Sequence, residues 1–195
     1  MIVHPYAAIC LQHGPVRGSG ADGAVVEALP FRTLAMAVSR HETIPEPTAG
    51  NIAAHHQVQM ALLNGGSIVP FRFGNVFSSD EHLRQEVEAR AEELGAKLDR
   101  LAGCVELTVR LPREGGEQTE TNRTGTRYLL ARKQQADAEQ KLKAQLNDLV
   151  KDWRRDRRGS EVRLACLIDP ERVAELRRRA PHLAVTGPWP PSSFV

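Results

Sequence analysis

The residues from Gly18 to Gly23, with the sequence GSGADG, match the G-x-G-x-x-G pattern of nucleotide-binding loops. Such a loop binds phosphate when a helix follows it directly, because the helix N-terminus then points its free amides at the phosphate. The residues that follow here, AVVEALP, are typical of a strand that ends at Pro30. We therefore interpret the segment as a hairpin loop. Dinucleotide binding, with Glu42 as the acid for the ribose, is the minor alternative.

Histidines and nucleophiles form no recognisable catalytic or metal-binding pattern. His55 and His56 are adjacent, so on a helix their side chains point about 100° apart and cannot share a metal ion. His41 is isolated, and no serine or cysteine has a convincing base nearby. We expect these histidines at the surface or at helix ends. The sequence predicts no catalytic residue, no cofactor and no metal ion.

The composition is that of an ordinary globular protein. Of the 195 residues 41% are hydrophobic and 26% are charged, and the formal net charge is +2. Cys10, Cys104 and Cys166 each lie in an apolar stretch, which favours reduced core thiols. No apolar run approaches the roughly 18 residues that span a bilayer, and the N-terminus lacks the pattern of a signal peptide. We expect a cytoplasmic protein that does not enter a membrane.

Basic side chains gather in two places late in the chain. The first group exceeds its neighbouring acids by three positive charges and comprises Lys151, Arg154, Arg155, Arg157 and Arg158. The second is Arg177–Arg179. A solvated helix end is the simplest interpretation of the first group, and contact with an acidic protein surface is the second. Arg154, Arg155, Arg157 and Arg158 are therefore candidate partner-binding residues. Nucleic acid is not predicted, because the strands VELTVRL and VRLACLI carry no aromatic side chains.

Short elements are predicted for the first third of the chain. Strands are expected over residues 2–11, 24–29 and 33–39, and a helix over residues 51–64 that ends at Gly65 and Gly66. A short strand follows over residues 68–73. Ser78 and Glu81 form a capping box, after which apolar residues at helical spacing predict one helix up to Leu101.

The rest of the chain shows clearer periodicity. Residues 105–111 and 162–168 alternate as half-buried strands, and a polar, glycine-rich loop covers residues 112–126. A long helix is predicted over residues 128–153, with an apolar stripe that is weak early and strong late. A short helix begins at Asp169, and a last strand includes Leu183 and Val185.

These elements predict an α+β protein. If residues from about 113 to 158 are a helical insertion, the order from Ile68 onward is β-α-β-β-α-β, the ferredoxin-like arrangement. The predicted organisation is an N-terminal α+β domain over residues 1–66 and a ferredoxin-like domain over residues 67–187. A proline-rich C-terminal docking tail covers residues 188–195.

Four segments carry a family resemblance. The C-terminal TGPWPPSSFV is the most specific, and it is accompanied by HHQVQMALLNGG, IVPFRFGNVFSS and the helix opening TRYLLARKQQAD. Together they resemble the gas vesicle protein F/L family. The motif and interdomain docking residues that this resemblance indicates are Pro70, Arg72, Phe73, Gly74, Phe77, Gly187, Pro188, Trp189, Pro190, Pro191 and Phe194.

The resemblance implies a gas vesicle accessory or minor structural protein with no catalytic residues. Its implied partners are the small, hydrophobic shell protein and other accessory proteins, and its implied location is the gas vesicle. We expect the tail to be an intramolecular latch with Trp189 buried, and a peptide offered to a partner is the alternative. A generic ferredoxin-like binding module, for RNA or a regulatory protein, is the second functional hypothesis. An enzyme that uses the glycine loop is a distant third.

Overall fold

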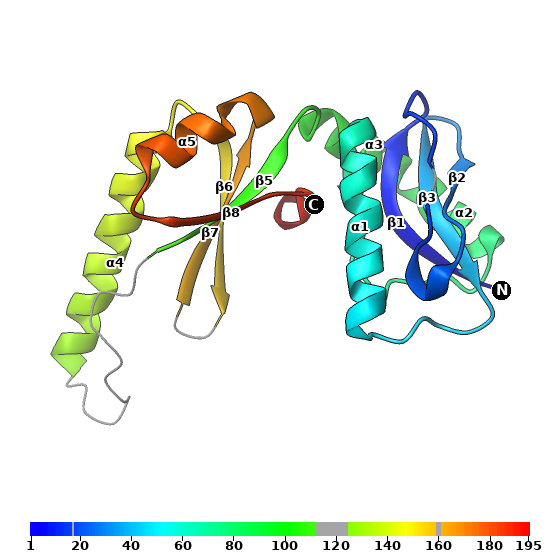
Figure 1. Ribbon diagram of the computed structural model, residues 1–195, viewed down its shortest axis with the longest axis horizontal. Coiled ribbons are helices and arrows are strands. Elements are labelled where there is room, and N and C mark those ends of the chain that lie inside the picture. The colour runs from blue at the N-terminus through cyan, green and yellow to red at the C-terminus, as the bar shows by residue number, and fades with distance from the viewer. Residues whose placement is uncertain (17, 112–124, 159–160) are drawn as a thin grey trace. The chain divides into compact units, whose positions relative to one another are not determined.

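The computed structural model describes residues 1–16, 18–111, 125–158 and 161–195 (Figure 1). The chain divides into two compact units. Unit 1 contains Met1–Cys104 and Trp189–Val195, and unit 2 contains Val105–Pro188. Each unit has a four-stranded sheet with helices packed on it, which confirms the α+β class.

The sheet of unit 1 has the strand order β2-β3-β1-β4. Its strands are β1 (Ile2–Cys10), β2 (Glu27–Pro30), β3 (Leu34–His41) and β4 (Ile68–Pro70), and the neighbours pair antiparallel. The central strand β1 is buried on both faces from Val3 to Ile9. This explains why its sequence does not alternate between apolar and polar residues. The register shifts between Pro5 and Ala7, where the proline has no N–H for the ladder.

Helices of unit 1 contact the strands of its sheet. Helix α1 (Ala49–Gly65) contacts β1 and β4, and its first turn is capped by the Thr48 hydroxyl, which accepts a hydrogen bond from the Asn51 amide. Helices α2 (Asp80–Ala89) and α3 (Ala91–Arg100) replace the single helix predicted for this region. The break falls at Arg90, whose backbone is not helical. The cap of α2 is Ser79 rather than Ser78, since the Ser79 hydroxyl accepts from the His82 amide at 3.1 Å.

The expected domain boundary after residue 66 is corrected by the strand pairing. Ile68 of β4 lies opposite Ile9 of β1, so this strand completes the first sheet. Helix α3 contacts β1 and β4, so Leu94 and Leu98 are buried in unit 1 rather than against the strand that begins at Val105. The pattern of apolar residues and turns predicts that β4 is a strand. It does not indicate which sheet a strand of three residues joins. The division between the units falls after Cys104 instead.

Unit 2 has the order β-α-β-β-α-β along the chain. Its elements are β5 (Val105–Arg110), α4 (Gly125–Leu146), β6 (Val150–Arg158), β7 (Glu161–Ile168), α5 (Val173–Arg179) and β8 (Ala184–Trp189). The sheet order is β6-β7-β5-β8, with β7 antiparallel to both β5 and β6. This is the ferredoxin-like arrangement that the sequence predicts. In the structure the arrangement begins at β5 and not at Ile68. β5, α4 and β6 take the places predicted for the strand over residues 68–73, the helix up to Leu101 and the strand over residues 105–111.

The predicted helical insertion over residues 113–158 is corrected in the same way. Within its described part, α4 is the first crossover helix of the fold, and residues 150–158 form the strand β6. The helix ends before Asn147 and Asp148, residues that favour turns over helix interiors. The sequence of β6, VKDWRRDRR, shows no two-residue alternation of apolar and polar residues, so it predicts a helix end instead of a strand.

Candidate functional site

The glycine segment has a structural role in unit 1. It forms a short 3-10 turn (η1, Ala21–Gly23) and is followed by β2, not by a helix. The Ala21 amide donates a hydrogen bond to the Tyr6 hydroxyl at 3.0 Å. A Cβ atom added at Gly20 would overlap that same hydroxyl. Glycine is therefore required for the loop to close over Tyr6, and the turn offers no helix N-terminus to a phosphate.

Three histidines that are far apart in the sequence meet in the core of unit 1. His4 of β1, His41 of β3 and His55 of α1 are all buried. His55 Nε2 lies 2.9 Å from the carbonyl oxygen of Phe71, which can only accept, so this nitrogen carries the proton. His55 Nδ1 therefore accepts a hydrogen bond from His4 Nε2 at 2.8 Å. The remaining ring nitrogen, His4 Nδ1, is buried without a hydrogen-bond partner among the described residues.

A second branch of hydrogen bonds begins at His41. Its Nε2 lies 2.7 Å from the Ser39 hydroxyl, which lies 2.9 Å from the Tyr6 hydroxyl. Its Nδ1 faces the Asp22 carboxylate at 3.9 Å. Asp22 is in turn held by Asn51, which donates to its carboxylate at 2.7 Å and accepts from its amide. The branch ties η1, β1, β3 and α1 together.

The surroundings keep these histidines neutral. Burial lowers the pKa of His4 to about 4, with smaller contributions from His55 and His41. Burial also lowers the pKa of His55 and of His41. The cluster is therefore a set of uncharged hydrogen-bonding groups near pH 7 and a poor proton donor.

The prediction that these histidines lie at the surface or at helix ends is wrong for His41 and His55, which are buried. The missed signal is helical spacing: His55 shares one face of α1 with Val58, Gln59 and Leu62, all of them buried. His56 points elsewhere and is half-buried.

The family motif from Pro70 to Phe77 closes over the same cluster. The Phe73 ring centroid lies 5.2 Å from that of His4 and 5.6 Å from that of His55. Phe77 exchanges two backbone hydrogen bonds with Val3. Pro70 is buried, Gly74 turns the chain with φ of 92°, and Arg72 is exposed. Apart from Arg72 and Gly74, the motif residues therefore pack within unit 1.

The tail residues differ in their burial. Pro190, Pro191 and Phe194 are buried in unit 1, and Arg100 donates a hydrogen bond to the Phe194 carbonyl. Trp189 is 37% exposed, with its ring centroid 5.5 Å from that of His56. The aromatic anchor of the tail is therefore Phe194, at 2% exposed, and not Trp189 as expected. Gly187 and Pro188 precede the anchor and are joined by a cis peptide bond.

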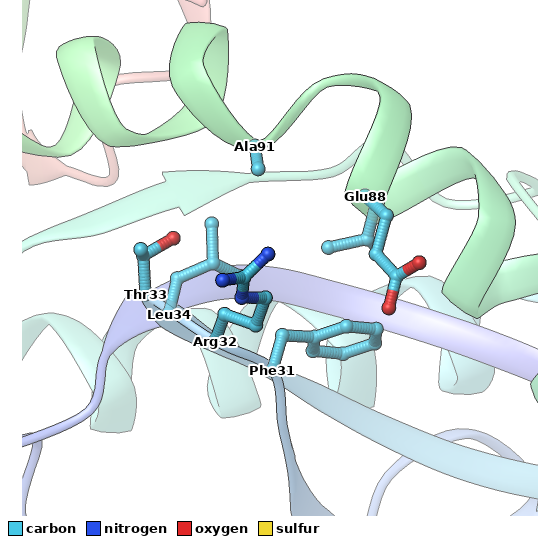
Figure 2. Close-up of a pocket in the computed structure, with 7 residues that line it drawn as sticks. Phe31, Arg32, Thr33, Leu34, Glu88 and Ala91 are labelled. Carbon is cyan, nitrogen blue, oxygen red and sulfur yellow. The ribbon is translucent and has the colours of Figure 1, made fainter.

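A pocket of about 570 Å³ opens between the β2–β3 turn and the junction of α2 and α3 (Figure 2). Leu34 and Val87 are its buried apolar residues. Figure 2 shows Arg32 and Glu88 on either side of the Phe31 ring. The Arg84 guanidinium also lies 5.3 Å from the centre of that ring. The lining has no histidine, cysteine or paired carboxylates, so the pocket suits an apolar group and offers no evident catalysis.

The candidate partner-binding arginines lie on a strand. Arg154, Arg155, Arg157 and Arg158 belong to β6, opposite residues 161–165 of β7. Arg155 reaches Glu139 of α4 at 3.3 Å, and Arg154 lies 3.7 Å from Asp152. The side chains of Arg154 and Arg155 are exposed by about half and a third, so both still reach solvent.

Helix α4 has two different halves. In its second half Leu142 and Leu146 are buried, as the late apolar stripe predicts. In its first half Leu129 and Leu130 are 65% and 54% exposed. Arg132 and Lys133 follow them and are also exposed. A helix that packs along only part of its length leaves the other part for contact with another molecule.

Among residues 1–16, 18–111, 125–158 and 161–195, no group of three or more histidine, cysteine or acidic side chains is placed to hold a metal ion. In the same part of the chain, no helix is long and apolar enough to cross a membrane. Cys104 and Cys166 are buried, and burial raises the pKa of Cys166.

By its fold, the chain is an α+β protein of two units, and the second unit is ferredoxin-like. The family model described as gas vesicle synthesis protein GvpL/GvpF matches residues 6–195. The chain therefore belongs to this family.

Individual relatives agree with that assignment. Gas vesicle protein F1 of Halobacterium salinarum is 26% identical over 190 residues, which cover 90% of this chain and 84% of the relative. The crystal structure of the gas vesicle protein GvpF from Anabaena is similar with a TM-score of 0.80 at 15% identity, covering 99% of this chain and 95% of that one. GvpF from Microcystis aeruginosa gives a TM-score of 0.79 at 14% identity, covering 99% and 98%.

Proposed function

We propose that this chain is a non-enzymatic accessory or minor structural protein of the gas vesicle, which binds the hydrophobic shell protein and supports vesicle assembly. Family membership over residues 6–195 supports a role at the vesicle. The resemblance noted in the sequence supplies the shell protein and other accessory proteins as partners. The histidine cluster, which is buried and neutral, is consistent with a structural role rather than with turnover of a substrate.

The observation that carries the proposal is the exposed first half of α4. Single exposed leucines are common on protein surfaces, but Leu129 and Leu130 are adjacent on a helix and both more than half exposed. No acid lies between Gly125 and Ala136, so this half of the helix combines apolar and basic side chains. Such a surface suits a hydrophobic partner that carries acidic groups.

The tail belongs to the proposal as a structural element. Phe194, Pro190 and Pro191 hold the C-terminus in unit 1, which supports an intramolecular latch. A proline-rich segment loses little backbone entropy on docking, so this packing stabilises a terminus that otherwise frays. Trp189, like Ser192, Ser193 and Val195, keeps more than a third of its surface exposed.

The experiment is co-expression of the tagged protein with the shell protein, followed by capture at low salt. We expect the wild-type chain to retain the shell protein. The variant Leu129→Ser with Leu130→Ser is expected to lose most of it, because the apolar contact of α4 is removed. The matched control is Leu11→Ser, which changes an exposed leucine of unit 1.

Three results would count against the proposal. The first is the absence of any captured vesicle protein. The second is an equal loss of capture with Leu11→Ser, which would remove α4 as the contact. The third is recovery of RNA in place of protein, which would favour a generic ferredoxin-like binding module.

A further inference from the structure

The two sheets have four edge strands, and three of them are unsuited to pairing with another chain. β2 has four residues and ends in Pro30. β4 has three residues and ends in Pro70. β8 contains Pro188. Short strands and prolines are two of the means by which proteins protect sheet edges, and bulges and charged side chains are two others.

The fourth edge strand, β6, is neither short nor interrupted by proline, so its protection rests on its charged side chains and on one register shift at its beginning. It runs over nine residues without a proline, and it lies at the end of the sheet order of unit 2. The register with β7 is regular from Asp152 to Arg158, and the one shift lies at the beginning of the strand. In an antiparallel pair, alternate residues direct their N–H and C=O groups away from the partner. Within the described part of the chain, no strand pairs with that side of β6.

Charge decides which strand could be added there. β6 carries five basic and two acidic side chains, an excess of three positive charges. Two of the basic groups reach acids outside β6, since Lys151 lies 2.5 Å from Asp169 and Arg155 lies 3.3 Å from Glu139. Arg154 lies 3.7 Å from Asp152 and keeps 54% of its side chain exposed. The sequence of β6 is therefore net positive, and an acidic strand would be the complementary neighbour along this edge.

The same charges argue against a second copy of this chain. Two β6 strands paired antiparallel would bring together two segments that each carry an excess of positive charge. Like charges placed opposite one another destabilise a strand pair. Self-association through this edge is therefore disfavoured, and an oppositely charged segment is favoured.

We propose that β6 is a strand-addition site for an acidic, extended segment of a partner protein. The partner's backbone pairs with the free edge of β6, and its carboxylates face the basic side chains. In this mode the main-chain hydrogen bonds supply affinity and the side chains supply specificity. Strand addition at β6 uses a different surface of unit 2 from shell-protein binding by α4. Each of the two proposals can be correct when the other is wrong.

The probe is a fluorescent nine-residue peptide that alternates glutamate with valine or threonine, titrated into the full chain and followed by anisotropy. We expect saturable binding that weakens as salt is raised, because the contact is partly electrostatic. A second peptide has the same side chains and methylated central backbone nitrogens. It keeps the charge and loses the N–H donors, so it is expected to bind at least about tenfold more weakly.

Protein variants test the location. Arg154→Glu with Arg157→Glu is expected to weaken binding of the first peptide by about tenfold or more. The control is Lys141→Glu with Arg178→Glu, which makes the same change in net charge on α4 and α5. It is expected to change the affinity by less than about threefold. Amide hydrogen exchange adds a direct readout, since alternate amides of β6 should gain protection when the peptide binds.

Several outcomes would overturn the assignment. Equal binding of the methylated peptide would show electrostatic attraction without strand pairing. Equal weakening by both pairs of variants would remove β6 as the location. Tighter binding of a single-stranded oligonucleotide than of the peptide would identify the edge as a nucleic-acid surface. If the chain forms a dimer, and the variant Arg154→Glu with Arg157→Glu dissociates it, then β6 binds a second copy of this chain and not an acidic partner.

Discussion

The cores of the two units differ in their content of buried polar side chains. The core of unit 1 includes six buried uncharged polar or histidine side chains: His4, Ser39, His41, Asn51, His55 and Gln59. Among the described residues of unit 2, the core is made mainly of apolar side chains from β5, β7 and α4, and the buried polar residues are Glu106 and Glu139. Glu139 lies at the edge of that core, where Lys143 and Arg155 pair with it.

This difference has a physical consequence. An apolar core is stabilised by area removed from water, a contribution that depends little on pH. A buried polar network is stable only while every member keeps its hydrogen bond and its neutral form. Unit 1, with its buried histidines, should therefore respond to a fall from pH 7 to pH 5 more strongly than unit 2 does. The four predictions below test that contrast, from the largest expected effect to the smallest.

The first prediction concerns the apolar part of unit 1. Phe194→Ala removes a buried aromatic side chain and should lower the free energy of unfolding of unit 1 by roughly 3–5 kcal/mol. Trp189→Ala should cost about 1 kcal/mol, because more than a third of that side chain is already exposed. Chemical denaturation of both variants measures the difference. Equal losses would mean that Trp189 anchors the tail as strongly as Phe194 does.

The second prediction is acid sensitivity confined to unit 1. The pKa of His4 is lower in the folded chain, at about 4, than the ordinary value of 6.5. The unfolded chain therefore binds the proton more readily, and stability falls as the pH falls from about 6.5 to about 4. For His4 alone the loss by pH 4 is on the order of 3 kcal/mol. His55 and His41 contribute in the same direction, whereas the facing Asp22 carboxylate opposes it.

Amide hydrogen exchange at pH 7 and pH 5, expressed as protection factors, provides the measurement. Amides of β1 and β3 should lose protection at the lower pH, and amides of β5 and β7 should keep theirs. A parallel loss in both sheets would show that the two cores do not differ in the way proposed.

The sequence predicted most elements and misplaced some of their partners. β1, β3, α1, β5 and β7 were identified to within a few residues, because each has a clear apolar pattern or a clear terminus. β6 was missed because its charged side chains hide the strand period. The pairing of β4 with β1 is non-local, and a three-residue strand carries no signal of its partner.

The candidate site shows the same limit. His4 and His55 are 51 residues apart in the sequence, so no local motif predicts their contact. Helical spacing on α1 does indicate that His55 is buried. The family motifs were found from the residues alone, but the burial of Phe194 in place of Trp189 depends on how the chain turns after Pro191.

The third prediction tests the closure of the glycine loop over the polar core. Gly20→Ala places a methyl group where the Tyr6 hydroxyl lies, so the loop must shift and the Ala21–Tyr6 hydrogen bond must lengthen. We expect a loss of about 1–3 kcal/mol in the stability of unit 1. Gly14→Ala is the matched control, since no atom lies within 4 Å of its added Cβ. If both variants melt at the wild-type temperature, the loop does not constrain Tyr6.

The last prediction concerns the surface of unit 2 and has the smallest expected effect on stability. Leu129→Ser with Leu130→Ser changes side chains that already meet solvent, so the free energy of unfolding should change by less than about 0.5 kcal/mol. Leu146→Ala, in the packed half of the same helix, should cost roughly 2–5 kcal/mol because Leu146 is fully buried. Thermal unfolding of the two variants separates a packed half from a free half. A large loss with the serine variant would mean that the first half of α4 stabilises unit 2 itself. In that case, the loss of shell-protein capture by the serine variant would reflect a folding defect. An unchanged melting temperature is therefore needed before a loss of capture can be attributed to binding.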